Sequence, residues 1–250
     1  MNKTQVSYYQ KFGNLKIKDL FNRRETELTL KGYKDFLKDK KKFNYKNYGK
    51  LYSYLKDKNK PTSLHGLMKY KNFIFYKLAK SKKLQTLANK LTDKKTKLYG
   101  IQFFIKNKDA NLPTSPHQDN AYWCFKKSAG LSFWISLQNT NKNNGCMYYY
   151  EKSHLLDYKH FKNEHVPGST FRCAAPKKLK KKYYTLKTGD CVVHDSRTIH
   201  GSFNNISQKN RIAFIVSFIP KTAKKDPLML KKYKKNFKKV KEINYKKFNQ

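Results

Sequence analysis

The spacing of hydrophobic residues along the chain changes near residue 97. Before that point, apolar positions recur every three or four residues, the period of an amphipathic helix, in KGYKDFLKDKKKF (31–43) and LHGLMKYKNFIFYKLAKSKKLQTLANKL (64–91). Pro61, Thr62 and Ser63 form a helix start signal ahead of the second segment. We therefore predict that residues 1–96 are mostly helical.

Beyond residue 97 the pattern becomes one of short alternating or apolar runs bounded by turn residues, which is typical of strands. About seven such strands without long helices between them predict an antiparallel sandwich or barrel with helices packed on one face. The predicted strands are 98–106, 120–125, 130–137, 145–151, 182–186, 190–195 and 211–219. We expect one domain over residues 1–220, with its β core at 97–220, followed by a basic tail at 221–250. Within that tail Tyr233, Phe237 and Val240 have the spacing of one stripe on a peripheral helix.

The last predicted strand has two different faces, because alternate residues of a strand point to opposite sides. One face is uniformly apolar and should pack under the helices: Ile212, Phe214, Val216 and Phe218. The other is small and mixed, as expected of a barrel interior with room for a ligand: Arg211, Ala213, Ile215 and Ser217. An arginine that points into such an interior needs an anion, and a small dicarboxylate held by two parallel hydrogen bonds meets that need.

The net charge of +41, from 57 Lys+Arg against 16 Asp+Glu, has two interpretations. It is either the footprint of a polyanion partner such as nucleic acid or a consequence of AT-rich codon usage. Only five of the basic residues are arginine, the side chain whose fork suits phosphates and bases, so a nucleic-acid partner is not favoured. The oligomeric state stays open.

Several classes of protein are disfavoured by what the sequence lacks. No apolar run approaches 18 residues, so we expect no membrane span. The first residues lack the apolar core of a secretory signal, and we expect a cytoplasmic location. Four cysteines stand far apart without a Cys-x-x-Cys pair, which suggests neither a zinc knuckle nor a disulfide framework.

Candidate metal chemistry begins in TSPHQDNAYW, a lysine-free stretch that holds His117 and Asp119. In a strand both side chains would reach one metal ion, although such a pair also arises by chance. His200, in the segment GDCVVHDSRTIHGS, supplies a third ligand, while His194 is interpreted as a hydrogen-bonded core residue. Two imidazoles and one carboxylate leave three adjacent positions open, as in non-haem Fe(II) oxygenases. The remaining loop histidines are interpreted as solvated: His154, His160 and His165.

Three stretches, PHQDNAYW, FWISL followed by NNGCMYYYEKSH, and GDCVVHDSRTIHGSFNNISQKNRIAF, resemble the phytanoyl-CoA dioxygenase family of Fe(II)/2-oxoglutarate-dependent oxygenases. The resemblance implies a double-stranded β-helix, a cupin-like jelly-roll barrel, with a helical N-terminal part. It implies that iron is bound by His117, Asp119 and His200. It also implies that Arg211 grips the far carboxylate of the cosubstrate 2-oxoglutarate, assisted by Ser202. Gln102 and Trp134 would line the cosubstrate pocket, and O2 would be the second cosubstrate.

The activity implied is hydroxylation or oxidative cleavage of a small molecule, with succinate and CO2 as coproducts. The substrate is unidentified, and the positive charge of the chain predicts that it is anionic. Because residue 119 is a carboxylate, no iron position is left for a halide, which disfavours halogenation. One alternative is a nucleic-acid demethylase using the same iron chemistry; those enzymes carry a second arginine where this chain has Ser217. Another is a non-enzymatic jelly-roll binding module. Glu151-Lys152-Ser153-His154 replaces the family's Pro-Gly-Ser-His turn, and the lysine-rich loop 157–182 is peculiar to this chain, so the substrate stays open.

Overall fold

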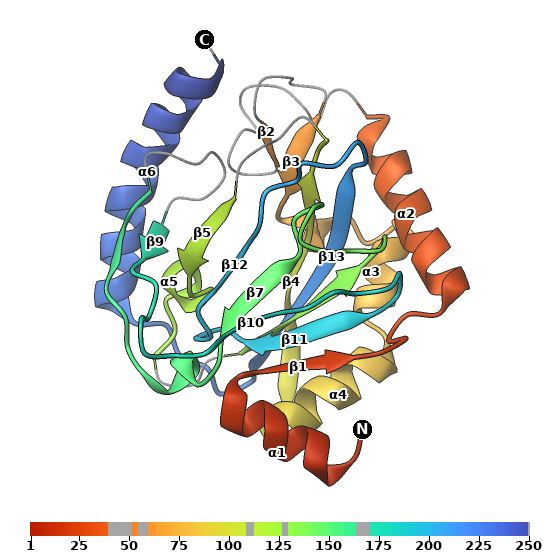
Figure 1. The fold of residues 1–250 in the computed structure, drawn as a ribbon, viewed down its shortest axis with the longest axis horizontal. Helices are drawn as coiled ribbons and strands as arrows, with labels where there is room; N and C mark the ends of the chain where they lie inside the picture. Colours follow the sequence, from red (N-terminus) through yellow and green to blue (C-terminus); the bar gives the residue numbers. More distant parts are fainter. Residues whose placement is uncertain (40–51, 55–59, 109–112, 127–129, 164–170, 250) are drawn as a thin grey trace.

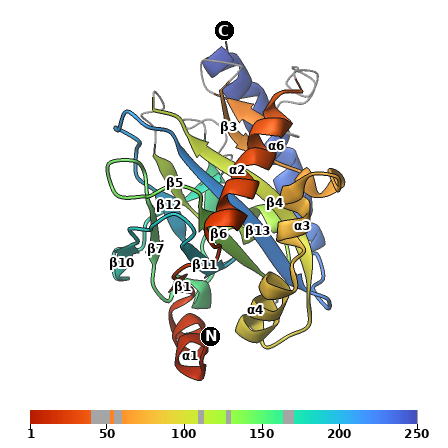
Figure 2. The ribbon, with the colours of Figure 1, turned by 90° about the vertical axis from the view of Figure 1, so that its right-hand side faces the viewer.

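The computed structural model describes residues 1–39, 52–54, 60–108, 113–126, 130–163 and 171–249, and its centre is a pair of antiparallel sheets that face each other (Figures 1 and 2). The larger sheet has seven strands in the order β1 (Asn14–Ile17), β11 (Cys191–Asp195), β6 (Leu131–Ser136), β13 (Arg211–Pro220), β4 (Thr96–Lys106), β3 (Pro61–Leu64) and β2 (Tyr52–Tyr54). The smaller has the order β10 (Lys181–Tyr183), β7 (Met147–Tyr150), β12 (His200–Ser202) and β5 (Thr114–His117). A separate hairpin pairs β8 (His160–Lys162) with β9 (Phe171–Cys173). The predicted jelly-roll architecture is confirmed.

Helices cover the outer face of the larger sheet, on the side away from the smaller one (Figure 2). The N-terminal helices are α1 (Lys3–Phe12), α2 (Arg23–Leu37), α3 (Ile74–Ala79) and α4 (Lys82–Thr92). Aromatic side chains fill the layer between helices and sheet: Phe36, Phe75, Phe103 and Phe214 are each 0% exposed. Phe214, Val216 and Phe218 of β13 belong to this layer, as their alternation predicted.

The predicted helix start at Pro61–Ser63 is wrong, because residues 61–64 form β3 instead. Ser63 and Leu64 pair with β4, so sheet pairing overrides the local signal. The single helix predicted over 64–91 is divided into the 3₁₀ turn η3 (Leu67–Lys69), α3 and α4. Gly66 has a positive φ of 62°, and Ser81 accepts the backbone N–H of Leu84 as the N-cap of α4. Residues 40–43 of the first predicted helix lie outside the described residues.

The strand predicted at 120–125 is also wrong, since Asn120–Trp123 form the short helix α5. The side chain of Asn120 donates to the Phe125 carbonyl oxygen (2.9 Å) and accepts the Phe125 backbone N–H (3.1 Å). These two bonds close the chain into a turn, and Cys124 takes a positive φ of 53° there. Asparagine side chains commonly form such local bonds in competition with a strand ladder.

The C-terminal segment forms the long helix α6 (Pro227–Asn249), which lies beside β5 and β9 (Figure 1). Tyr233 joins it to the core, with ring centroids 5.8 Å from Phe171 and 6.2 Å from Tyr122. The ring of Phe237 lies next to that of Tyr233, with centroids 5.4 Å apart, so two members of the predicted stripe lie together. The division of the chain at residue 220 stays a prediction.

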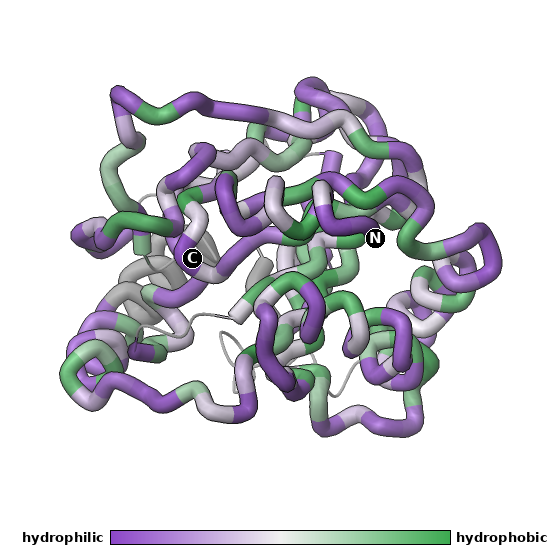
Figure 3. Tube along the Cα trace, turned by 90° about the horizontal axis from the view of Figure 1, so that it is seen from below, coloured by the Kyte–Doolittle hydropathy of each residue, from purple (hydrophilic) through white to green (hydrophobic). Residues whose placement is uncertain are grey.

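Hydrophilic residues predominate in the outer segments of the chain, and hydrophobic residues are more frequent toward the middle (Figure 3). The outward side of α6 is rich in exposed lysine, including Lys231, Lys235 and Lys238. No helix in the described ranges combines the length and apolar content required to cross a bilayer.

Candidate metal centre

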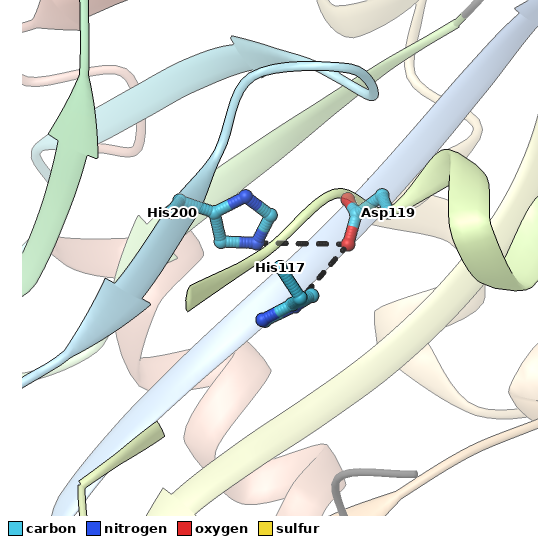
Figure 4. Close-up of side chains that lie close together, drawn as sticks. All are labelled: His117, Asp119 and His200. Atoms are coloured by element: carbon cyan, nitrogen blue, oxygen red, sulfur yellow. Dashed lines mark ion pairs between the residues drawn. The ribbon is translucent and has the colours of Figure 1, made fainter. Parts of the chain in front are cut away.

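Two of the predicted ligands, His117 and His200, meet because the strands that carry them are neighbours. His117 ends β5 and His200 begins β12, and the antiparallel register places these two residues directly opposite each other. Residues opposite each other on paired strands project to the same face. Their ring centroids are 4.3 Å apart, and the side chains converge with that of Asp119 (Figure 4).

Each imidazole has one nitrogen fixed by the backbone and the other left facing the site. His117 Nδ1 donates to the carbonyl oxygen of Ser115 (2.9 Å), and His200 Nδ1 donates to that of Thr198 (2.9 Å). Burial lowers the pKa of both rings, for His200 well below its usual range, so both are neutral and Nε2 carries a lone pair. A backbone acceptor at Nδ1 is the usual way in which proteins orient a metal-binding histidine.

Asp119 completes the group from the turn that follows β5, not from the strand itself. Its backbone angles (φ −55°, ψ −35°) are helical, so the prediction that strand alternation aligns it with His117 is wrong. Oδ1 lies 3.9 Å from Nε2 of His117 and 3.6 Å from Nε2 of His200. One ligand atom from each of the three residues lies within 4.8 Å of the others, an arrangement that suits a single divalent transition metal.

The Asp119 carboxylate is ionised and its second oxygen is held by the protein. Oδ2 accepts a hydrogen bond from Ser132 Oγ (2.9 Å) and lies 3.3 Å from His194 Nε2. Burial alone would raise the pKa of this carboxyl, but His200 and the hydrogen bond from His194 outweigh burial and lower it below its usual range. His194 is therefore a hydrogen-bonded core residue, as predicted.

Arg211 lies on the inner face of the larger sheet and is 2% exposed. Its guanidinium stands over the ring of Trp134 at 5.1 Å, and NH1 is 3.5 Å from the Phe104 carbonyl oxygen. Among the described residues, Nε has no hydrogen-bond partner and no carboxylate lies within ion-pair distance of the guanidinium. Burial lowers the pKa of Arg211 to about 10, and buried Lys106 is its cross-strand neighbour. A buried guanidinium without a paired carboxylate among the described residues favours a bound anion at this point.

Gln102 and Ser202, the other two residues predicted to bind the cosubstrate, are engaged in hydrogen bonds within the protein. Gln102 lies on β4 four residues before Lys106, the cross-strand partner of Arg211. It is opposite Ile215 and hydrogen-bonds to His65. Ser202 is fully buried and donates to Thr114 Oγ1 at 2.8 Å. The roles of Gln102, Trp134 and Ser202 stay predictions.

His160 was interpreted as a solvated loop histidine, and that interpretation is wrong. It begins β8, and its Nε2 accepts the backbone N–H of Gln118 (3.2 Å) while Nδ1 donates to the Tyr158 carbonyl oxygen (3.0 Å). His160 thus braces the residue between two candidate ligands. No spacing rule could reveal this contact, because the residues are about forty positions apart in sequence. His154 does not contact the candidate ligands, since its Nε2 donates to the carbonyl oxygen of Gln10. His165 lies outside the described residues.

Buried neutral histidines make the metal-free protein sensitive to acid. Burial lowers the pKa of His65 and of His160 to about 4, whereas an unfolded chain takes up these protons near pH 6.5. The unfolded state therefore binds more protons between pH 6.5 and 4, and stability falls as the pH falls through that window. Each residue contributes about 1.4 kcal/mol per pH unit at most.

Urea unfolding at a series of pH values measures this loss. The His160→Gln variant is expected to show a slope shallower by about one proton than the parent protein. Equal slopes in the two proteins would contradict a neutral, buried His160.

Comparison with known proteins defines the family. The sequence profile of the phytanoyl-CoA dioxygenase (PhyH) family matches residues 9–213. A phytanoyl-CoA dioxygenase of Arabidopsis thaliana is 26% identical over 149 residues, which are 58% of this chain and 50% of that protein. The rice protein phytanoyl-CoA dioxygenase 1 is 26% identical over 148 residues, 58% of this chain and 53% of its own length. This chain belongs to the phytanoyl-CoA dioxygenase family, although the matches span about half the length of these curated relatives.

Solved structures share the fold at low sequence identity. The epimerase SnoN, in complex with Fe3+, alpha ketoglutarate and nogalamycin RO, superposes with a TM-score of 0.71 at 20% identity, covering 90% of this chain and 86% of that one. EvdO2 from Micromonospora carbonacea has a TM-score of 0.72 at 16% identity, covering 91% of this chain and 94% of that one. These matches agree with the barrel seen here.

Proposed function

We propose that this chain is an Fe(II)- and 2-oxoglutarate-dependent dioxygenase. The observation that carries the proposal is the convergence of two neutral imidazole nitrogens and one carboxylate oxygen from the residues that the family pattern marks. His117, Asp119 and His200 would hold the iron. When bound, Fe(II) with 2-oxoglutarate and O2 supplies the oxidation of a C–H bond, with release of succinate and CO2.

The protein's own contribution is binding and orientation. Neutral His117 and His200 offer lone pairs at Nε2, and Asp119 offsets one of the two positive charges of the metal. Arg211 would pair with the far carboxylate of 2-oxoglutarate, which supplies the anion that its buried guanidinium lacks. Alpha ketoglutarate bound in SnoN, which shares the fold, supports this cosubstrate.

We further propose an anionic small molecule as the substrate, hydroxylated or oxidatively cleaved. The hairpin β8–β9 lies beside the metal-binding segment, since Phe171 contacts Tyr122 and Tyr122 contacts His117. This hairpin exposes Lys162 and Arg172. Cations next to the site attract anions and raise their local concentration.

Two other functions are less well supported. The residue that stands where nucleic-acid demethylases carry a second arginine is Ser217, which is buried and bonded to Ser132. A binding module without chemistry would not need neutral imidazoles, an ionised carboxylate and a buried arginine together. The geometry therefore favours an enzyme of small molecules.

A reducing compartment such as the cytoplasm suits this chain. All four cysteines are free and buried. Burial raises the pKa of the Cys146 thiol to about 11 and that of Cys173 to about 12, so both stay protonated and unreactive.

The test of the proposed function is aerobic incubation with Fe(II) and 2-oxoglutarate, with succinate measured across a panel of anionic and neutral metabolites. We expect iron-dependent succinate at a low uncoupled rate that rises with the true substrate, and we expect that substrate among the anions. A full metabolite panel without iron-dependent succinate would overturn the proposal. A neutral substrate would overturn only the proposed anionic class.

A further inference from the structure

A row of polar side chains crosses three neighbouring strands of the larger sheet beside Asp119. His194 of β11 lies opposite Ser132 of β6, which in turn lies opposite Ser217 of β13. All three are almost fully buried, at 2%, 1% and 2% exposure. The adjacent row on the same face is apolar: Val192, Trp134 and Ile215. Buried polar groups require hydrogen-bond partners, and this row finds one in Asp119.

The hydrogen bonds of the row have a fixed direction. An ionised carboxylate only accepts, so Ser132 Oγ–H donates to Asp119 Oδ2 at 2.9 Å. Ser132 has no second hydrogen, so Ser217 Oγ donates to it across 3.0 Å. His194 faces Oδ2 through Nε2 at 3.3 Å and must carry its proton there. Its Nδ1 has no hydrogen-bond partner among the described residues.

The two oxygens of Asp119 therefore have different environments. Oδ2 is occupied by two donors, Ser132 and His194, whereas Oδ1 faces the two ligand histidines. An octahedral metal with two imidazoles and one carboxylate oxygen keeps three open positions. If both oxygens bound the metal, only two would remain, too few for a chelating keto acid together with O2.

We infer that His194 and Ser132, with Ser217 behind them, are positioning residues that restrict Asp119 to single-oxygen ligation. The inference rests on the proposed function and deepens it, because it explains how the site keeps a coordination position for O2. Partners that orient a metal ligand commonly contribute ten- to a hundredfold in metal affinity.

The experiment measures metal binding without turnover. Purified wild type, Ser132→Ala, His194→Leu, His194→Gln and His200→Leu are titrated anaerobically with Fe(II) or Co(II). 2-Oxoglutarate is then added to the Fe(II) samples while the visible charge-transfer band is recorded. Ser136→Ala is the matched control: it removes a serine hydroxyl that is equally buried on β6 but bonds the Gln138 carbonyl oxygen.

We expect Ser132→Ala and His194→Leu to bind one metal ion with about ten- to a hundredfold weaker affinity and to show a weakened or shifted band. His194→Gln keeps an N–H donor and should recover much of the loss, and Ser136→Ala should match wild type. Unchanged affinity and band in Ser132→Ala and His194→Leu would overturn the inference and leave the proposed function intact.

Two further outcomes separate the inference from the function. Complete loss of the metal in His194→Leu, with retention in His200→Leu, would make His194 a ligand and overturn the inference. Failure of the wild-type protein to bind any metal would instead overturn the proposed function, and the inference with it.

Discussion

Replacing Asp119 by alanine is expected to abolish iron-dependent succinate formation, with turnover reduced more than about a hundredfold. The substitution removes one of the three candidate ligand atoms, and with it the carboxylate that faces the imidazoles of His117 and His200. Loss of a residue that merely orients a ligand lowers metal affinity or activity ten- to a hundredfold. Loss of the ligand itself should have a larger effect. Succinate release and anaerobic metal titration measure the two consequences.

Asp157→Ala is the matched control for this substitution. Asp157 is also an aspartate, but its side chain is 98% exposed and pairs with Arg197 on the surface. Its removal should leave both measurements unchanged, because exposed ion pairs contribute little. If Asp119→Ala retained iron-dependent turnover with unaltered metal affinity, residue 119 would not be a ligand.

Replacing Arg211 by methionine is expected to produce two changes of opposite sign. The KM for 2-oxoglutarate should rise at least about a hundredfold, because a charge-assisted pair with a carboxylate is lost. The protein without cosubstrate should become more stable by about 1–3 kcal/mol, since a buried charge that has no paired carboxylate is replaced by an apolar side chain of similar length.

Initial rates at varied 2-oxoglutarate and urea unfolding measure these two changes. Arg197→Met, which removes a partly exposed arginine paired with Asp157, should alter neither. If the Arg211→Met protein were less stable and its KM for 2-oxoglutarate unchanged, Arg211 would stabilise the folded core and would not bind a carboxylate.

The proximity of the candidate metal ligands agrees with the sequence, but their geometry was predicted only in part. His117, Asp119 and His200 lie together in the structure, and their role as ligands stays a prediction. Alternate side chains of β13 belong to different core clusters, as strand periodicity predicted. Periodicity does not extend to Asp119, because β5 ends at His117 and the chain turns into α5. Side-chain bonds of Asn120, which alternation does not register, cause that turn.

Other features depend on contacts between distant segments. His160 reaches Gln118, and His194 and Ser132 reach Asp119, only after strands far apart in sequence are placed side by side. The strand β3 is a further case, because a helix start signal gave way to pairing with β4.

The barrel architecture, the three candidate ligand side chains and the inward-facing arginine could be read from the sequence, since hydrophobic period and motif spacing are properties of short stretches. Only the folded barrel shows which oxygen of Asp119 faces the two imidazoles and which residues hydrogen-bond to the other. This arrangement depends on sheet register, and register is set by the packing of the whole barrel and not by any local pattern.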